Sequence, residues 1–82
     1  MSTECPNKKE ILDYAAKIGV KNASIEDRGL LGWHLLGAGK SKGLFSRSLV
    51  CQAAEDCGMF YGGGGADWVQ IRPEQFKLPV TA

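Results

Sequence analysis

The segment Leu30-Leu31-Gly32-Trp33-His34-Leu35-Leu36 determines whether this chain has two helices on a sheet or three helices with a hairpin. On a helical wheel its apolar side chains point in all directions, whereas on a strand they separate into two faces. We therefore predict a mostly buried strand over residues 30–36. A helix from Ile25 to Leu36 remains the alternative, because Ser24 followed by Asp27 three residues later is typical of a helix start.

Two amphipathic helices are predicted on either side of this segment. Apolar residues recur at helical spacing over residues 8–18 and again over residues 46–57. Asn7 is placed to cap the first helix, and either Ser46 or Ser48 is placed to cap the second. Both patterns indicate helices that pack one apolar face against a core.

The C-terminal third predicts a β-hairpin. Met59–Tyr61 and Trp68–Arg72 have the composition of strands, and four consecutive glycines at residues 62–65 separate them. Glycine loses the most backbone entropy on ordering, so we expect this turn to be mobile or ordered only on binding. Pro73 ends the second strand, which we expect to lie exposed at a sheet edge.

These elements predict an α+β domain in which two helices pack on a small, mostly antiparallel sheet. We expect residues 1–82 to form a single domain with extended termini at residues 1–6 and 77–82. The order of helices before a glycine-tipped hairpin leaves one alternative open. It is a winged-helix-like domain of three helices with a C-terminal β-hairpin, in which residues 46–48 would open the recognition helix.

Composition and charge narrow the function classes. The chain has 82 residues, 44% of them hydrophobic, and a formal net charge of +1, which is typical of one globular domain and gives no overall attraction for nucleic acid. The N-terminal residues lack a signal-peptide pattern, and no apolar run is long enough to span a bilayer. Three cysteines, an odd number, indicate reduced thiols. We therefore expect a cytoplasmic protein without a membrane partner.

The glycine-rich segment Gly37-Ala38-Gly39-Lys40-Ser41 looks like the end of a phosphate-binding loop. The full motif requires glycine five positions before Gly39, where this chain has His34, so nucleotide hydrolysis is not expected. Exposed backbone N–H groups beside basic side chains still predict a simpler anion-contact loop. Its residues are Gly37, Gly39, Lys40 and Ser41.

Positive charge is concentrated in the same part of the chain. The stretch from Arg28 to Ala54 holds four basic residues and no acidic one. We expect this basic region to face an acidic or phosphate-bearing partner. Three aromatic residues near the glycine turn belong to the residue types that dominate protein interfaces. The predicted partner-binding residues are Lys40, Lys42, Arg47, Arg28, Phe60, Tyr61 and Trp68.

No catalytic or metal-binding set is evident. His34 is the only histidine and lies in an apolar run, which favours a buried packing role. The spacing of Cys5, Cys51 and Cys57 matches no usual zinc motif, and we predict no metal and no cofactor.

These features predict a small non-catalytic binding protein that regulates or inhibits a macromolecular partner by occupying its surface. Many small inhibitors and adaptors of phages and mobile elements have this profile. We expect a protein partner, with a nucleic-acid-binding regulator of winged-helix type as the alternative, and a monomer or weak homodimer.

Overall fold

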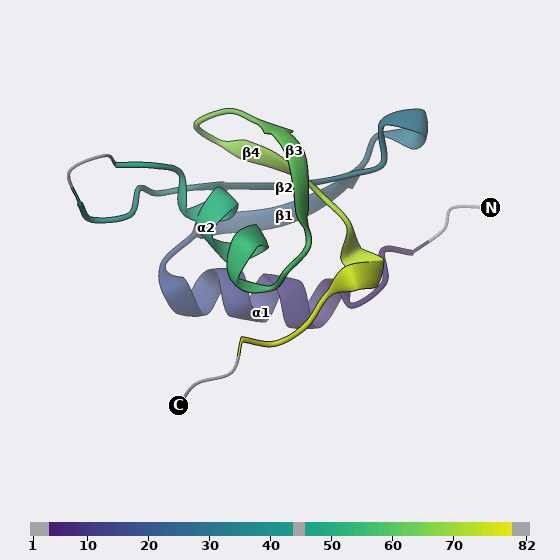
Figure 1. Cartoon of the computed structure of the whole chain (residues 1–82), viewed down its shortest axis with the longest axis horizontal. Coiled ribbons are helices and arrows are strands. Elements are labelled where there is room, and N and C mark those ends of the chain that lie inside the picture. Colours follow the sequence, from purple (N-terminus) through teal and green to yellow (C-terminus); the bar gives the residue numbers. More distant parts are fainter. Residues whose placement is uncertain (1–3, 44–45, 80–82) are drawn as a thin grey trace.

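The computed structural model describes residues 4–43 and 46–79, which form two α-helices on one face of a four-stranded antiparallel sheet (Figure 1). The strand order is β1-β2-β4-β3. This arrangement confirms the predicted α+β fold. The elements are, in chain order, α1 (Lys8–Ile18), β1 (Lys21–Asp27), β2 (Trp33–Ala38), α2 (Leu49–Asp56), β3 (Phe60–Gly64) and β4 (Trp68–Ile71), with short 3-10 helices at Gly29–Leu31 and Pro73–Gln75.

Helix α1 has the predicted bounds, and Ile11 and Ala15 on its apolar face are buried. Asn7 is the N-cap residue, as predicted, but its side chain does not cap the helix. The Asn7 backbone is left-handed at φ 57°, and its side chain makes no capping hydrogen bond. Its Nδ2 donates instead to the Pro73 carbonyl at 3.1 Å. Asn7 therefore ties the start of α1 to the chain that follows β4.

The segment of residues 30–36 is extended from Trp33 onward, as predicted, and Leu35 in its centre is fully buried. The prediction of burial was wrong for Leu30 and Leu31, which lie in the preceding 3-10 turn and are exposed. Asp27 explains the turn, because its Oδ1 accepts a hydrogen bond from the Gly29 N–H at 2.8 Å. A short side-chain acceptor of this kind stabilises a turn rather than a strand.

The alternative helix over residues 25–36 does not form. Residues 21–27 instead make β1, which pairs antiparallel with β2 and places Ile25 opposite Leu35. Within the described residues the three-helix, winged-helix-like alternative was therefore wrong. Strand β1 was missed because Asn22, at φ 56°, lies in an irregular stretch between Lys21 and Ser24 that interrupts the two-residue alternation.

Helix α2 begins at Leu49, three residues later than predicted. Ser48 is its cap, since its Oγ accepts a hydrogen bond from the Val50 N–H at 3.2 Å. Lys40 and Ser48 form an isolated antiparallel bridge, and the Ser48 backbone is extended, so the helix begins only after this residue. The helix buries Val50 together with Ala53 and Ala54.

The glycines do not form the tip of the hairpin. Gly62 to Gly64 belong to β3, and the Gly65 N–H donates to the Trp68 carbonyl at 2.8 Å, so residues 66 and 67 form the tip. A Cβ on Gly65 would lie only 2.8 Å from Trp68 Nε1. The glycine backbone thus makes room for the indole, and the prediction that residues 62–65 form the turn was wrong, because residues 62–64 are strand. Strand β4 was also misplaced, because it lies between β2 and β3 rather than at an edge.

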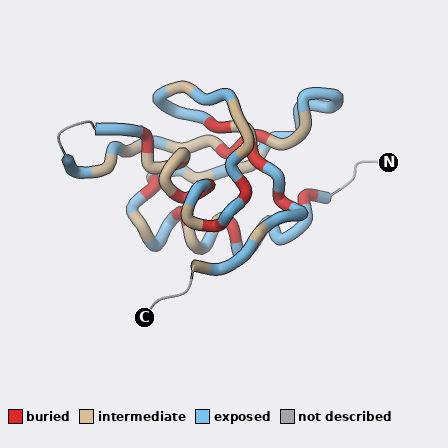
Figure 2. Tube along the Cα trace, viewed as in Figure 1, coloured by how far each residue is buried: buried red, intermediate tan, exposed pale blue. Residues whose placement is uncertain are grey.

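The core lies between the sheet and the helices (Figure 2). Cys5 is part of it and is buried, so the predicted extended N-terminal segment is anchored at this residue. Residues 77–79 have no regular secondary structure, and the Lys77 N–H donates to the Cys57 carbonyl. Residues 1–3 and 80–82 of the predicted extended termini lie outside the described residues. The largest fully buried side chains are Ile11, Leu35, Met59, Ile71, Val50 and Val69.

Candidate binding surface

In the described part of the chain, both helices lie on the same face of the sheet, and the opposite face carries no helix (Figure 1). We call this second side the open face. Leu35 and Val69 pair across the sheet and are buried toward the helices. Because side chains alternate along a strand, their neighbours point to the open face. These are His34 and Leu36 of β2 and Trp68 and Gln70 of β4.

An aromatic stack forms the centre of the open face. The rings of His34 and Trp68 are 4.9 Å apart between centroids, with 17° between their planes. They are diagonal neighbours, since Trp68 lies opposite Leu36 and Gln70 lies opposite His34. His34 is 8% exposed and Trp68 is 38% exposed. The indole therefore covers the histidine, which is buried as predicted, and itself faces solvent.

Other polar side chains on this face have partners within the molecule. The Arg72 guanidinium lies 4.4 Å from the centroid of the Tyr61 ring, a cation–π geometry. Gln70 Nε2 donates to the Leu31 carbonyl at 2.5 Å. Arg28 Nη2 lies 2.6 Å from a Glu26 carboxylate oxygen at the β1 end of the face. Arg72, Gln70 and Arg28 therefore each have a partner within the described residues.

The three predicted aromatic contact residues do not all lie on the same face of the sheet. Trp68 lies on the open face, and Tyr61 lies beside it under Arg72. Phe60 pairs with Ile71, which is buried toward the helices, so Phe60 lies on the other side of edge strand β3. It is 39% exposed there. Tyr61 and Trp68 can therefore share one partner surface without Phe60.

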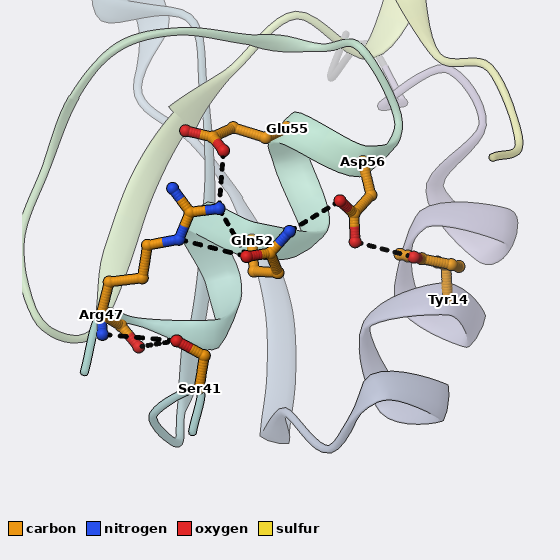
Figure 3. Close-up of polar contacts among 6 residues, drawn as sticks. All are labelled: Tyr14, Ser41, Arg47, Gln52, Glu55 and Asp56. Atoms are coloured by element: carbon orange, nitrogen blue, oxygen red, sulfur yellow. Dashed lines mark hydrogen bonds and ion pairs between the residues drawn. The ribbon is translucent and has the colours of Figure 1, made fainter. Parts of the chain in front are cut away.

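The exposed Arg47 side chain is bound to residues of α2 (Figure 3). Its Nη2 lies 2.7 Å from Glu55, and its Nε and Nη2 both donate to Gln52 Oε1. Gln52 in turn donates to Asp56 at 2.7 Å, and Asp56 accepts a hydrogen bond from the Tyr14 hydroxyl at 2.9 Å. This chain of contacts links the loop to α2 and α1.

The ion pairs reduce the charge excess predicted for residues 28–54. Arg28 is paired with Glu26 and Arg47 with Glu55, and both acids lie just outside that stretch of sequence. Lys40 and Lys42 are exposed, and neither has an ion-pair partner among residues 4–43 and 46–79. The two lysines are the part of the predicted basic site whose charge remains available to a partner.

The predicted anion-contact loop is only partly retained. Gly37 lies within β2, and its N–H donates to the Asp67 carbonyl at 3.0 Å, so including it was wrong. The Gly39 carbonyl accepts from the Leu49 N–H, and Ser41 Oγ lies 3.4 Å from both the backbone N and O of Arg47. Residues 44–45 of the loop between Lys40 and Arg47 lie outside the described residues. Lys40 is the exposed cation at the base of this loop.

The three cysteines are free thiols whose environment suppresses ionisation. Burial raises the pKa of Cys5 to about 11 and the pKa of Cys57 to about 11. Burial also raises the pKa of Cys51, with a smaller contribution from the Glu55 carboxylate. Reactive cysteines need thiolate at neutral pH, and these environments oppose it. Residues 4–43 and 46–79 contain no group of three or more His, Cys, Asp and Glu side chains that could hold a metal ion.

No family model matches this chain. Searches of curated proteins and of solved structures find no match either. Within the described ranges, neither helix has the length and apolar character needed to cross a membrane. The open face and the two lysines, Lys40 and Lys42, are the candidate contact sites for a partner.

Sequence reasoning missed Gln70 and Arg72 as contact residues, although the alternation over residues 68–72 places both on the same side as Trp68.

Proposed function

We propose that this chain is a non-catalytic binding protein that regulates or inhibits a protein partner by covering part of the partner's surface. One observation carries the proposal: the open face presents Trp68 stacked on His34, and Tyr61 beneath the Arg72 guanidinium. Tryptophan, tyrosine and arginine are the side chains most often found at the energetic centres of protein interfaces.

The internal contacts favour binding because they reduce its entropic cost. A long side chain such as arginine loses rotamer freedom when a partner immobilises it. Arg72 is already placed over the Tyr61 ring, and Trp68 is already stacked on His34. Lys40 and Lys42 add positive charge at the end of β2, which suits an acidic or phosphate-bearing partner.

Nucleic-acid binding is the second candidate, supported by the exposed lysines Lys40 and Lys42. Duplex recognition by α2 has little support. The helix buries its apolar side against the core, and the Arg47 guanidinium in front of it is paired with Glu55. Nucleic-acid affinity depends on many phosphate contacts and falls steeply with salt. Binding to a protein partner does not require that many contacts from cationic side chains.

We further infer that the protein works in the cytoplasm. Three thiols without a disulfide suit a reducing compartment. An inhibitory role of the kind found in phages and mobile elements is part of this proposal.

The function is tested by affinity capture with the immobilised chain from an extract of the cells that produce it, followed by mass spectrometry. Arg72→Glu reverses a charge on the open face and should reduce the captured partner at least about tenfold. Lys77→Glu makes the same change on the segment that runs along the helix side (Figure 1), and capture should be unchanged. The double variant Lys40→Glu, Lys42→Glu tests the loop and should weaken capture while the fold stays intact.

Two results would contradict the proposal. One is capture that Arg72→Glu and Lys77→Glu leave equally strong, because the open face would then not be the contact surface. The other is retention of generic RNA or DNA that decreases steeply between low and physiological salt and is lost in the double lysine variant. That result would establish the nucleic-acid alternative.

A further inference from the structure

A groove of about 720 Å³ opens between α1 and the β1 side of the sheet. Apolar side chains of Leu12, Ile25 and Trp33 line it, and none of the three is fully buried. Its charged lining residues have both signs: Lys8, Lys9, Glu4, Asp13 and Asp27. This groove is on the helix side of the sheet and does not include Trp68 or Tyr61 of the open face.

Two leucines project from the turn beside this groove. Leu30 is fully exposed and Leu31 is 63% exposed. The turn is held by several hydrogen bonds: Gly29 N–H to Asp27 Oδ1 at 2.8 Å, Arg28 N–H to the Gly32 carbonyl at 2.8 Å, and Gln70 to the Leu31 carbonyl. These contacts hold the turn backbone in the conformation in which both leucines are exposed. A fixed turn that exposes adjacent leucines favours burial against another surface.

The projecting leucines and the groove are neighbours. Asp27 precedes the turn and Trp33 follows it, and both line the groove. Figure 1 shows the turn at the same end of the molecule as the start of α1. Strand β1, whose Ile25 lines the groove, is also an edge of the sheet with one side unpaired. The exposed leucines, the groove and the unpaired edge of β1 therefore lie in one region of the surface.

This region has the features that a two-fold contact with a second copy of the chain requires. In a two-fold dimer, each copy uses the same patch, so that patch must contain both a projection and its complement. Here the apolar side chains of the turn match the apolar lining of the groove. The charged lining residues have both signs, Lys8 and Lys9 with Glu4, Asp13 and Asp27, which a patch that contacts its own copy requires.

We propose that two copies pair about a two-fold axis, each inserting Leu30 and Leu31 into the groove of the other. The contact is small, and association is therefore concentration-dependent and reversible. Dimerisation leaves Trp68 and Arg72 outside the contact, so a dimer carries two open faces. This inference is independent of the proposed function, because it uses a different surface.

Sedimentation velocity of the full chain, from about 1 µM to about 1 mM, tests the dimer in the range where small interfaces associate. The wild-type chain should shift from monomer to dimer as concentration rises. Leu30→Glu should raise the dimer dissociation constant at least about a hundredfold, because a two-fold dimer contains the Leu30 contact twice and the substitution removes both copies of it. Leu78→Glu is the matched control: it alters another exposed leucine outside the groove and should leave the dissociation constant unchanged.

A wild-type chain that stays monomeric throughout this range would overturn the proposal, as would equal dimerisation of Leu30→Glu and Leu78→Glu. Leu30 makes no core contact, so circular dichroism should show both variants folded. Partner capture by Leu30→Glu separates this proposal from the previous one. If Leu30→Glu abolishes capture and the wild-type chain is monomeric, the leucines bind the partner instead of a second copy, and the dimer is wrong.

Discussion

At Gly37 the absence of a side chain allows β2 to approach its neighbours closely. A Cβ at this position would lie 2.2 Å from Val20 Cγ1 and 3.3 Å from Val50 Cγ1. Both valines belong to the core, where added volume forces neighbours out of their packing. Gly37→Ala should therefore lower the free energy of unfolding by about 1–3 kcal/mol, measured by urea denaturation.

A double-mutant cycle provides the control for this prediction. Val20→Ala removes the atom nearest to the added methyl group, so Gly37→Ala should destabilise the Val20→Ala background less than it destabilises the wild-type chain. An equal cost in both backgrounds would show that the crowding is not the cause.

Sequence patterns assigned Gly37 to an anion-contact loop because glycines precede a lysine there. The reason for the glycine is the approach of Val20, which is 17 positions earlier in the chain. A contact of that kind leaves no local signal. His34, by contrast, was correctly predicted to be buried, although the side chain that covers it is Trp68 of β4 and not its apolar neighbours in the sequence, which point to the other face.

The buried thiols of Cys5 and Cys57 predict a loss of stability in alkaline solution. The pKa of each thiol is raised from 9.0 to about 11 in the folded chain. A group whose folded pKa is raised contributes stability that is present below the unfolded pKa and is lost as pH rises through the folded one. The melting temperature should therefore fall between about pH 9 and about pH 11.

The variant with both Cys5→Ala and Cys57→Ala tests the assignment. Its melting temperature should change less steeply over the same pH interval, whatever its value at neutral pH. Identical slopes for the variant and the wild-type chain would exclude the thiols as the origin.

At the scale of elements, Ser48 determines where α2 begins. Its Oγ accepts the Val50 N–H, one of the helical donors that has no partner within the helix. Ser48→Ala should lower the free energy of unfolding by about 1 kcal/mol, measured by thermal or urea denaturation. Ser46→Ala is the matched control and should change stability little, because Ser46 is exposed and precedes the cap. Equal effects of the two substitutions would contradict the assignment of the cap.

The elements were predictable to the extent that their signals are local. Helix α1 has the predicted bounds because its apolar spacing and the glycine that ends it are adjacent in sequence. Strand β1 was missed because the irregularity around Asn22 interrupts its alternation. The start of α2 was placed early because the pairing of Lys40 with Ser48, whose backbone is extended, joins residues that are not adjacent in the sequence.

At the scale of the whole molecule, the charge pattern in the sequence overstated the basic surface. Arg28 and Arg47 are each paired with an acid, and Lys40 and Lys42 are the cations of that region without an ion-pair partner among residues 4–43 and 46–79. Surface pairs of this kind contribute little stability, but they neutralise charge that a partner would otherwise meet. The α+β architecture was predictable, whereas the open face required the strand order, which no short segment encodes.

The central claim is that the open face contacts the partner, and the fluorescence of Trp68 tests it most directly. The chain has two tryptophans, so Trp33→Phe leaves Trp68 as the single reporter, and Trp68→Phe leaves Trp33 in the groove as its control. When the captured partner binds the Trp33→Phe variant, acrylamide quenching of Trp68 should fall toward that of a buried indole. Quenching of Trp68 that stays unchanged while the partner is bound would contradict the account.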